Sequence, residues 1–104
     1  MRLIRDHRGL PIRLTDERLA HILEHPEMAR LEEAITETLT APERVVQSLT
    51  DLRARLYYRF YAATPVSGKH LCVVVKNLDE DAFVVTAYLT DRMKRGVQLW
   101  PEIE

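Results

Sequence analysis

The sequence predicts an α+β fold, in which a short N-terminal β-hairpin and two helices pack on a four-stranded antiparallel meander sheet. Apolar residues recur at spacings of three and four between residues 15 and 39, as on an amphipathic helix. After Pro42 the spacing changes to two, as in half-buried strands. Short, turn-rich links separate these later runs and leave no room for crossover helices. We expect residues 1–104 to form one domain.

Turn and capping residues define the N-terminal elements. Residues 2–5 and 11–14 are β-like segments on either side of a turn at residues 6–9. Thr15 is a suitable N-cap for a first helix, because its hydroxyl can accept a hydrogen bond from the first helical turn. Pro26, which has no N–H to donate, should end that helix or open the next one. The apolar stripe of the first helix consists of Leu19, Ile22 and Leu23.

A second helix is predicted from Glu27 to about Leu39, and the segment 40–42 ends it. Four runs rich in β-branched and aromatic residues then indicate strands. These strands should pair antiparallel in sequence order, because the links between them are short. They span residues 44–49, 53–61, 71–77 and 83–90. The predicted core consists of Leu19, Ile22, Leu23, Leu31, Ile35, Val73, Val75, Val85 and Ala87.

Alternation along the strands divides their side chains between two faces. If the core covers one face, the opposite face gathers basic, aromatic and hydroxyl side chains, and Lys76 can join it. A solvated outer face has the same pattern as a binding surface, so both interpretations stay open at this point. The residues assigned to this opposite face are Arg55, Tyr57, Arg59, Thr86 and Tyr88.

The charge is unevenly distributed along the chain. The formal net charge is −1, which does not indicate a basic nucleic-acid-binding protein. Residues 1–51 carry seven Lys/Arg against ten Asp/Glu, a net of −3, whereas residues 52–101 carry eight against four, a net of +4. The basic second half is compatible with a phosphate-bearing partner, and equally with solvated side chains on an outer sheet face.

Cys72 is the single cysteine, so the chain has no internal disulfide. It lies within the apolar run 71–75, which predicts a small buried thiol rather than a nucleophile. No stretch reaches the ~18 apolar residues of a membrane span. The N-terminus also lacks the apolar segment of a signal peptide. We therefore expect a soluble, cytoplasmic protein without a membrane partner.

His21 and His25 lie one helical turn apart on the flank of the first predicted helix. Such a pair can bind a metal, but zinc needs a third and usually a fourth ligand, and no cysteine cluster or spaced carboxylate supplies them. A histidine beside a core is typically a half-buried hydrogen-bonding residue, and an acid–base group beside a cleft would lie there too. With no Gly-rich phosphate loop, G-x-S-x-G or C-x-x-C motif, we expect no metal and no cofactor.

Aromatic residues alternate with arginines in the segment 55–61. Aromatic rings can stack on the bases of single-stranded RNA while arginines neutralise its phosphates. The same cluster is also typical of a well-packed strand. The residues concerned are Arg55, Tyr57, Tyr58, Arg59, Phe60 and Tyr61.

Five short motifs are spread over about residues 12–100. They are Leu14-Thr15-x-x-Arg18-x-x-His21-Ile22, His25-Pro26-Glu27-Met28, Tyr57-Tyr58-Arg59, Val73-Val74-Val75-Lys76 and Val84-Val85-Thr86-Ala87-Tyr88. Together they resemble the small bacterial and phage-associated domains of the barnase–EndoU–colicin–RelE (BECR) superfamily. The resemblance implies N-terminal helices on a four-stranded antiparallel sheet. It also implies metal-independent, toxin-type cleavage of single-stranded RNA.

The resemblance further implies roles for individual residues. Metal-free cleavage makes a 2′-hydroxyl attack its own phosphorus, which needs a base, an acid and donors for the developing charge. His21 would be the base or acid, Lys76 and Arg59 the electrostatic clamp, and Thr86 and Tyr88 the positioning or proton-relaying hydroxyls. Substrate binding would involve Arg59, Tyr57 and Arg55. We expect His21, Lys76, Thr86 and Tyr88 to converge on one cleft, with Arg59 at its rim.

Two other functions fit the same scaffold. One is a non-catalytic protein-interaction module, and the other is a module that binds single-stranded nucleic acid without cleaving it. A histidine that points away from Lys76 and Thr86 would favour these alternatives. The partners expected are RNA, a cognate antitoxin or immunity protein, or a second copy of the chain in a homodimer.

Overall fold

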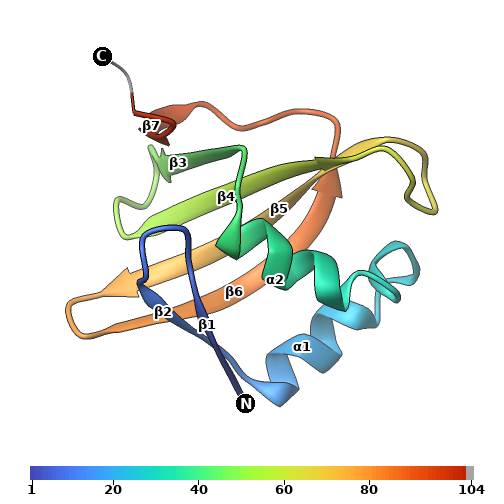
Figure 1. Ribbon diagram of the computed structural model, residues 1–104, viewed down its shortest axis with the longest axis horizontal. Helices are drawn as coiled ribbons and strands as arrows, with labels where there is room; N and C mark the ends of the chain where they lie inside the picture. The colour runs from blue at the N-terminus through green and yellow to red at the C-terminus, as the bar shows by residue number, and fades with distance from the viewer. Residues whose placement is uncertain (103–104) are drawn as a thin grey trace.

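The computed structural model describes residues 1–102 of the chain. It confirms the α+β class: both helices lie in front of a single sheet in Figure 1. The first half contains β1 (Arg2–Arg5), β2 (Pro11–Leu14), α1 (Asp16–Leu23), the 3₁₀ turn η1 (Pro26–Met28) and α2 (Glu32–Thr40). The second half contains β3 (Arg44–Ser48), β4 (Ala54–Tyr61), β5 (Lys69–Leu78), β6 (Asp81–Thr90) and β7 (Gly96–Trp100).

The sheet is larger than predicted, because it has seven strands in the order β1-β2-β6-β5-β4-β3-β7. The predicted antiparallel meander is confirmed in β3 to β6. The N-terminal hairpin extends the sheet beside β6 through one parallel pair, Arg13 with Phe83. Arg13 also donates two hydrogen bonds, of 2.9 and 2.7 Å, to the carboxylate of Asp81 at the start of β6. At the other edge, β7 pairs antiparallel with β3.

The first helix forms as predicted, and the Thr15 hydroxyl accepts a 3.1 Å hydrogen bond from the Arg18 N–H. The second predicted helix, from Glu27 to about Leu39, is wrong in its first part. After Pro26 the backbone hydrogen bonds span three residues, as in a 3₁₀ turn, and α2 begins only at Glu32.

The main core lies between the helices and the sheet. Five predicted core residues are buried there: Ile22, Ile35, Val73, Val75 and Ala87. Leu19 and Leu31 are partly buried against this core. Leu23 is half-buried and Val85 is not a core residue. Val85 lies at a shift in register, where Val74 pairs with Thr86 and Val75 pairs with Val84, so that Val84 takes its place in the core.

A second, smaller apolar cluster lies on the opposite face of the sheet. Its buried members are Val46, Leu56, Tyr58 and Cys72. We call this side of the sheet the open face, because both helices pack on the other side, the helix face. The strand registers place the following residues of the central strands on the open face: Leu56, Tyr58, Phe60, His70, Cys72, Val74, Lys76, Thr86, Tyr88 and Thr90. No helix among residues 1–102 is long and apolar enough to cross a membrane.

Candidate functional site

The end of the open face near Thr90 presents aromatic side chains to solvent. The register aligns Phe60, His70 and Thr90 across three neighbouring strands. Phe60, the penultimate residue of β4, is 46% exposed. Its ring meets the His70 ring edge-on, with 5.2 Å between the ring centroids. This row therefore offers two neighbouring planar groups at the surface.

The connection between β6 and β7, residues Asp91–Arg95, crosses the open face beside this row. It must span β5, β4 and β3 to join β6 to β7. Two contacts hold it on this face. The Lys94 N–H donates a 2.9 Å hydrogen bond to the Tyr58 hydroxyl, and Met93 packs on the second apolar cluster. We call this segment the basic connection.

The basic connection carries three exposed cations, Arg92, Lys94 and Arg95. None of the ion pairs among residues 1–102 includes their side chains. Its one acidic residue, Asp91, is bound by Lys69 at 2.7 Å. The helical segment 15–40, in contrast, has seven acidic residues against two arginines, a net of −5. Positive charge is thus available on the open face, and negative charge dominates the helices.

Beneath the basic connection lies a row of protonated groups, Tyr58, Cys72 and Tyr88. Burial raises the pKa of the Tyr58 hydroxyl to about 12. It also raises the pKa of the Tyr88 hydroxyl and of the Cys72 thiol. The Tyr88 hydroxyl is buried without a hydrogen-bond partner among the described residues. Cys72 is a buried free thiol, as the sequence predicts, and its raised pKa disfavours the reactive thiolate form.

Three of the four predicted catalytic residues lie on the open face, namely Lys76, Thr86 and Tyr88. The Lys76 ammonium is already bound to the Asp51 carboxylate at 2.6 Å. This contact and a backbone hydrogen bond lower the pKa of Asp51. Lys76 is therefore neutralised by a neighbouring turn rather than free to clamp a phosphate.

His21 does not join them, so the predicted convergence on one cleft is wrong. Helix α1 packs on the helix face through Ile22, which turns the neighbouring His21 outward. Its side chain is 61% exposed, and its Nδ1 lies 3.7 Å from a Glu24 carboxylate oxygen. The sheet separates His21 from Thr86. His25 lies beside His21, with 6.5 Å between ring centroids, and no group of three potential metal ligands forms among residues 1–102.

The predicted substrate-binding residues Arg55, Tyr57 and Arg59 lie on the helix face, so their assignment to the face of Thr86 and Tyr88 is wrong. Tyr57 is fully buried in the main core. Arg59 donates a 2.7 Å hydrogen bond to the Ala41 carbonyl at the end of α2. The same alternation also places Arg55 on this side. The alternation of Arg55, Tyr57 and Arg59 predicted a polar outer face, but the tyrosine ring between the two arginines is part of the core.

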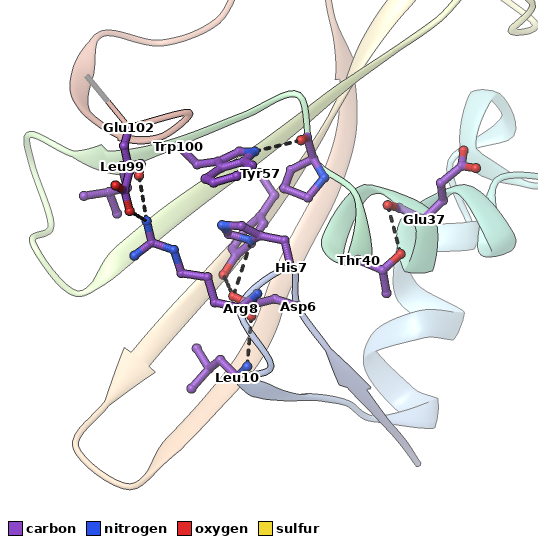
Figure 2. Close-up of polar contacts among 11 residues, drawn as sticks. Asp6, His7, Arg8, Leu10, Glu37, Thr40, Tyr57, Leu99, Trp100 and Glu102 are labelled. Carbon is purple, nitrogen blue, oxygen red and sulfur yellow. Dashed lines mark hydrogen bonds and ion pairs between the residues drawn. The ribbon is translucent and has the colours of Figure 1, made fainter. Parts of the chain in front are cut away.

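Figure 2 shows a polar cluster around the turn between β1 and β2, which the sequence did not indicate as a site. The buried Asp6 carboxylate accepts a 2.7 Å hydrogen bond from the Tyr57 hydroxyl. It also accepts 2.9 Å hydrogen bonds from the N–H groups of Arg8 and Leu10. The His7 ring lies tilted against Trp100, with 4.9 Å between centroids. An acidic residue in a four-residue turn was the only signal in the sequence, and it is too common to predict a site.

His7 has the more unusual environment. Both ring nitrogens are buried and have no hydrogen-bond partner among the residues that the structure describes. Burial lowers the pKa of His7, and the positive charges of Arg8 and Arg55 act in the same direction, while Asp6 opposes them. This environment favours the neutral form of the imidazole. Searches of family models, curated proteins and solved structures found no match to this chain.

Proposed function

We propose that this domain binds single-stranded nucleic acid, with RNA as the expected polymer, on the open face of its sheet. The observation that carries the proposal is the basic connection, which is fixed beside the exposed aromatic row of Phe60 and His70. Single-stranded nucleic-acid sites combine planar side chains that stack on bases with cations that contact the backbone. Both components are adjacent here.

Each component has a defined task. Phe60, with His70 against its edge, offers a stacking surface for one or two unpaired bases. The three cations of the basic connection contact the phosphates on either side of those bases. They are free to do so because none is held by a carboxylate among residues 1–102. The Thr90 hydroxyl donates to the Arg92 carbonyl at 3.0 Å and accepts from the Arg92 N–H at 3.2 Å, so it fixes the start of the basic connection.

The distribution of charge orients the polymer. The net charge of −5 over residues 15–40 repels a polyanion from the helices, whereas the cations of the basic connection attract it to the open face. The overall charge of −1 is therefore no obstacle, because the relevant charge is the local one. A modest number of phosphate contacts also predicts moderate affinity with a clear dependence on salt.

Binding without cleavage is the form of the proposal that the geometry favours. Cleavage needs a proton-transfer group within hydrogen-bond reach of the scissile phosphate, and His21 is on the far side of the sheet from Thr86. The resemblance to BECR domains supports RNA as the polymer. It does not place the predicted base, His21, on this face.

Fluorescence anisotropy with a labelled single-stranded RNA of about 12 nucleotides tests the proposal. Phe60→Ala should weaken binding by about 5- to 150-fold, because one stacked base contributes about 1–3 kcal/mol. The double variant Arg92→Gln/Arg95→Gln should reduce the slope of log affinity against log salt by about 1.4. The matched control is Arg18→Gln/Arg30→Gln, which removes two exposed cations from the helical side and should not weaken binding.

The contrary outcome is equally clear. Equal losses in the two double variants would show that only overall charge matters, and the open face would not be the site. The absence of any binding to single-stranded RNA by the wild type would favour the protein-interaction module. Gel analysis of the same samples with EDTA, comparing the wild type with His21→Ala, tests for metal-independent cleavage. We expect the RNA to stay intact.

A further inference from the structure

A small hollow lies on the helix face, between the β1–β2 turn and the edge of the sheet formed by β3 and β7. Its volume is about 80 Å³, and its walls are His7, Arg8, Val45, Arg55 and Leu99. Figure 2 shows Arg8 reaching from the turn toward Leu99 and Glu102, with the His7 ring beside it. Two arginines and an imidazole therefore meet in a space with apolar walls on its other sides.

We infer that this hollow is a binding site for a small oxyanion, such as orthophosphate or a carboxylate. Arg55 is half-buried, and its guanidinium approaches the Tyr57 hydroxyl, where it acts to lower the pKa of that group, but it forms no ion pair among residues 1–102. A partly buried guanidinium usually has such a partner, because burying a charge without one is costly. The planar guanidinium is also the side chain best suited to two oxygens of a carboxylate or phosphate.

The nearby Asp6 does not take the place of the ligand. Its two oxygens already accept three hydrogen bonds, from the Tyr57 hydroxyl and from the N–H groups of Arg8 and Leu10. No hydrogen bond or ion pair joins Asp6 to the guanidinium of Arg8 or Arg55. The Asp6 carboxylate thus stabilises the turn and leaves both guanidinium groups to another acceptor.

The size of the hollow restricts the ligand. A hollow of about 80 Å³ has room for a few waters or for one compact ion. Sites for drug-sized ligands and cofactors are typically about 300–1,000 Å³. A nucleotide is therefore too large to enter, and only an isolated oxyanion or a terminal one fits. This site is separate from the proposed RNA surface, because the two lie on opposite faces of the sheet.

Glu102 acts as a competitor at the mouth of the hollow. Its carboxylate lies 2.8 Å from the Arg8 guanidinium, which also donates a 3.3 Å hydrogen bond to the Leu99 carbonyl. The Glu102 side chain is 74% exposed and can turn into solvent at little cost. A bound anion would take over Arg8 from Glu102, and removal of this carboxylate should strengthen binding.

Isothermal titration calorimetry of the full chain at pH 7, with sodium phosphate and with sodium acetate at matched ionic strength, tests the inference. We expect saturable binding at one site per chain. Arg55→Gln should weaken binding about tenfold or more, because hydrogen bonds to charged groups are among the stronger ones. Glu102→Gln should strengthen it several-fold. Arg53→Gln, an exposed arginine in the preceding turn, is the matched control and should bind as the wild type does.

Several results would overturn the inference. One is that neither anion produces a saturable signal; another is that Arg55→Gln and Arg53→Gln bind alike. Because Glu102 is exposed, Glu102→Gln retains the fold, and an unchanged affinity in this variant would also contradict the site. If phosphate binds more tightly than acetate, the natural ligand is a phosphate; the reverse order indicates a carboxylate. RNA binding by the same variants is a separate measurement, so either proposal can fail alone.

Discussion

Tyr57 and Tyr58 follow one another in β4 and are both fully buried, but they belong to different apolar clusters. Tyr57 points into the main core, where helices cover the sheet, and its hydroxyl donates to the buried Asp6. Tyr58 points to the open face, where the basic connection covers it and donates a backbone hydrogen bond to its hydroxyl. One side of the strand is covered by α2 and the β1–β2 turn, and the other by the five residues of the basic connection.

This difference has a functional consequence. Side chains on the helix face are buried in the main core. A short connection covers only part of the open face, so the side chains next to it stay exposed to solvent. On the open face Phe60 keeps 46% of its surface in solvent, and the connection brings three cations next to it. The same contacts that shield Tyr58 therefore position the charges that we propose to contact RNA.

The largest effect is expected on the helix face. Tyr57→Phe removes the 2.7 Å hydrogen bond to one oxygen of the buried Asp6 carboxylate, which accepts no other among residues 1–102. We expect a loss of about 2–3 kcal/mol in the free energy of unfolding, because one oxygen of a buried carboxylate is left without a donor while the other keeps the N–H groups of Arg8 and Leu10. Urea denaturation measures this loss. A midpoint equal to that of the wild type would show that Asp6 finds another donor or becomes protonated.

Tyr58→Phe should have a smaller effect, although it also removes one hydroxyl from a buried ring. The lost contact is the 2.9 Å hydrogen bond from the Lys94 N–H, which lies near the surface and can donate to water instead. We expect a loss of about 0.5–1 kcal/mol in the free energy of unfolding. We also expect weaker RNA binding, because the basic connection is less firmly held. If Tyr58→Phe lowers the free energy of unfolding as much as Tyr57→Phe does, the two hydroxyls are equally important and the predicted difference between the two faces is wrong.

The smallest effect is expected for the pH dependence contributed by His7. Burial holds the pKa of His7 below its ordinary value of 6.5, and only Asp6 opposes this shift, so the unfolded chain takes up the proton first as the pH falls. The contribution of neutral His7 to stability is therefore complete above pH 6.5 and is lost progressively below it. His7→Phe, which retains an aromatic ring against Trp100, should lose this part of the pH dependence.

Unfolding free energies of the wild type and His7→Phe between about pH 8 and about pH 5 measure the difference. His21, His25 and His70 are present in both proteins and cancel in the comparison. If the free energy of unfolding depends on pH in the same way in both proteins, the assignment of a lowered pKa to His7 is contradicted.

Local patterns in the sequence predicted the elements that depend on local chemistry. The cap at Thr15 and the period of two in the later strands led to α1 and to the central meander. The pairing of β2 with β6 rests on a single residue pair between segments about seventy positions apart, which no local pattern reports. The strand β7 has only five residues and becomes recognisable only through its pairing with β3.

The site was predicted less well for a related reason. The alternation of side chains along a strand shows which residues share a face, and Thr86 and Tyr88 do share one. It does not show which face is buried when both carry large side chains, as in β4. Tyr57 is buried because its hydroxyl finds a hydrogen-bond acceptor in Asp6, which lies 51 positions away in the sequence. The register shift at Val85 then reverses the expected roles of Val84 and Val85.

The most direct test of the central claim is the mapping of bound RNA by NMR. Isotope-labelled protein is titrated with the single-stranded RNA, and the chemical shifts of every assigned amide are followed. The largest changes should occur at Phe60, His70 and Thr90 and in the basic connection, Asp91–Arg95, while α1 and α2 stay unchanged. The largest changes around His21, or along the helices, would contradict binding on the open face.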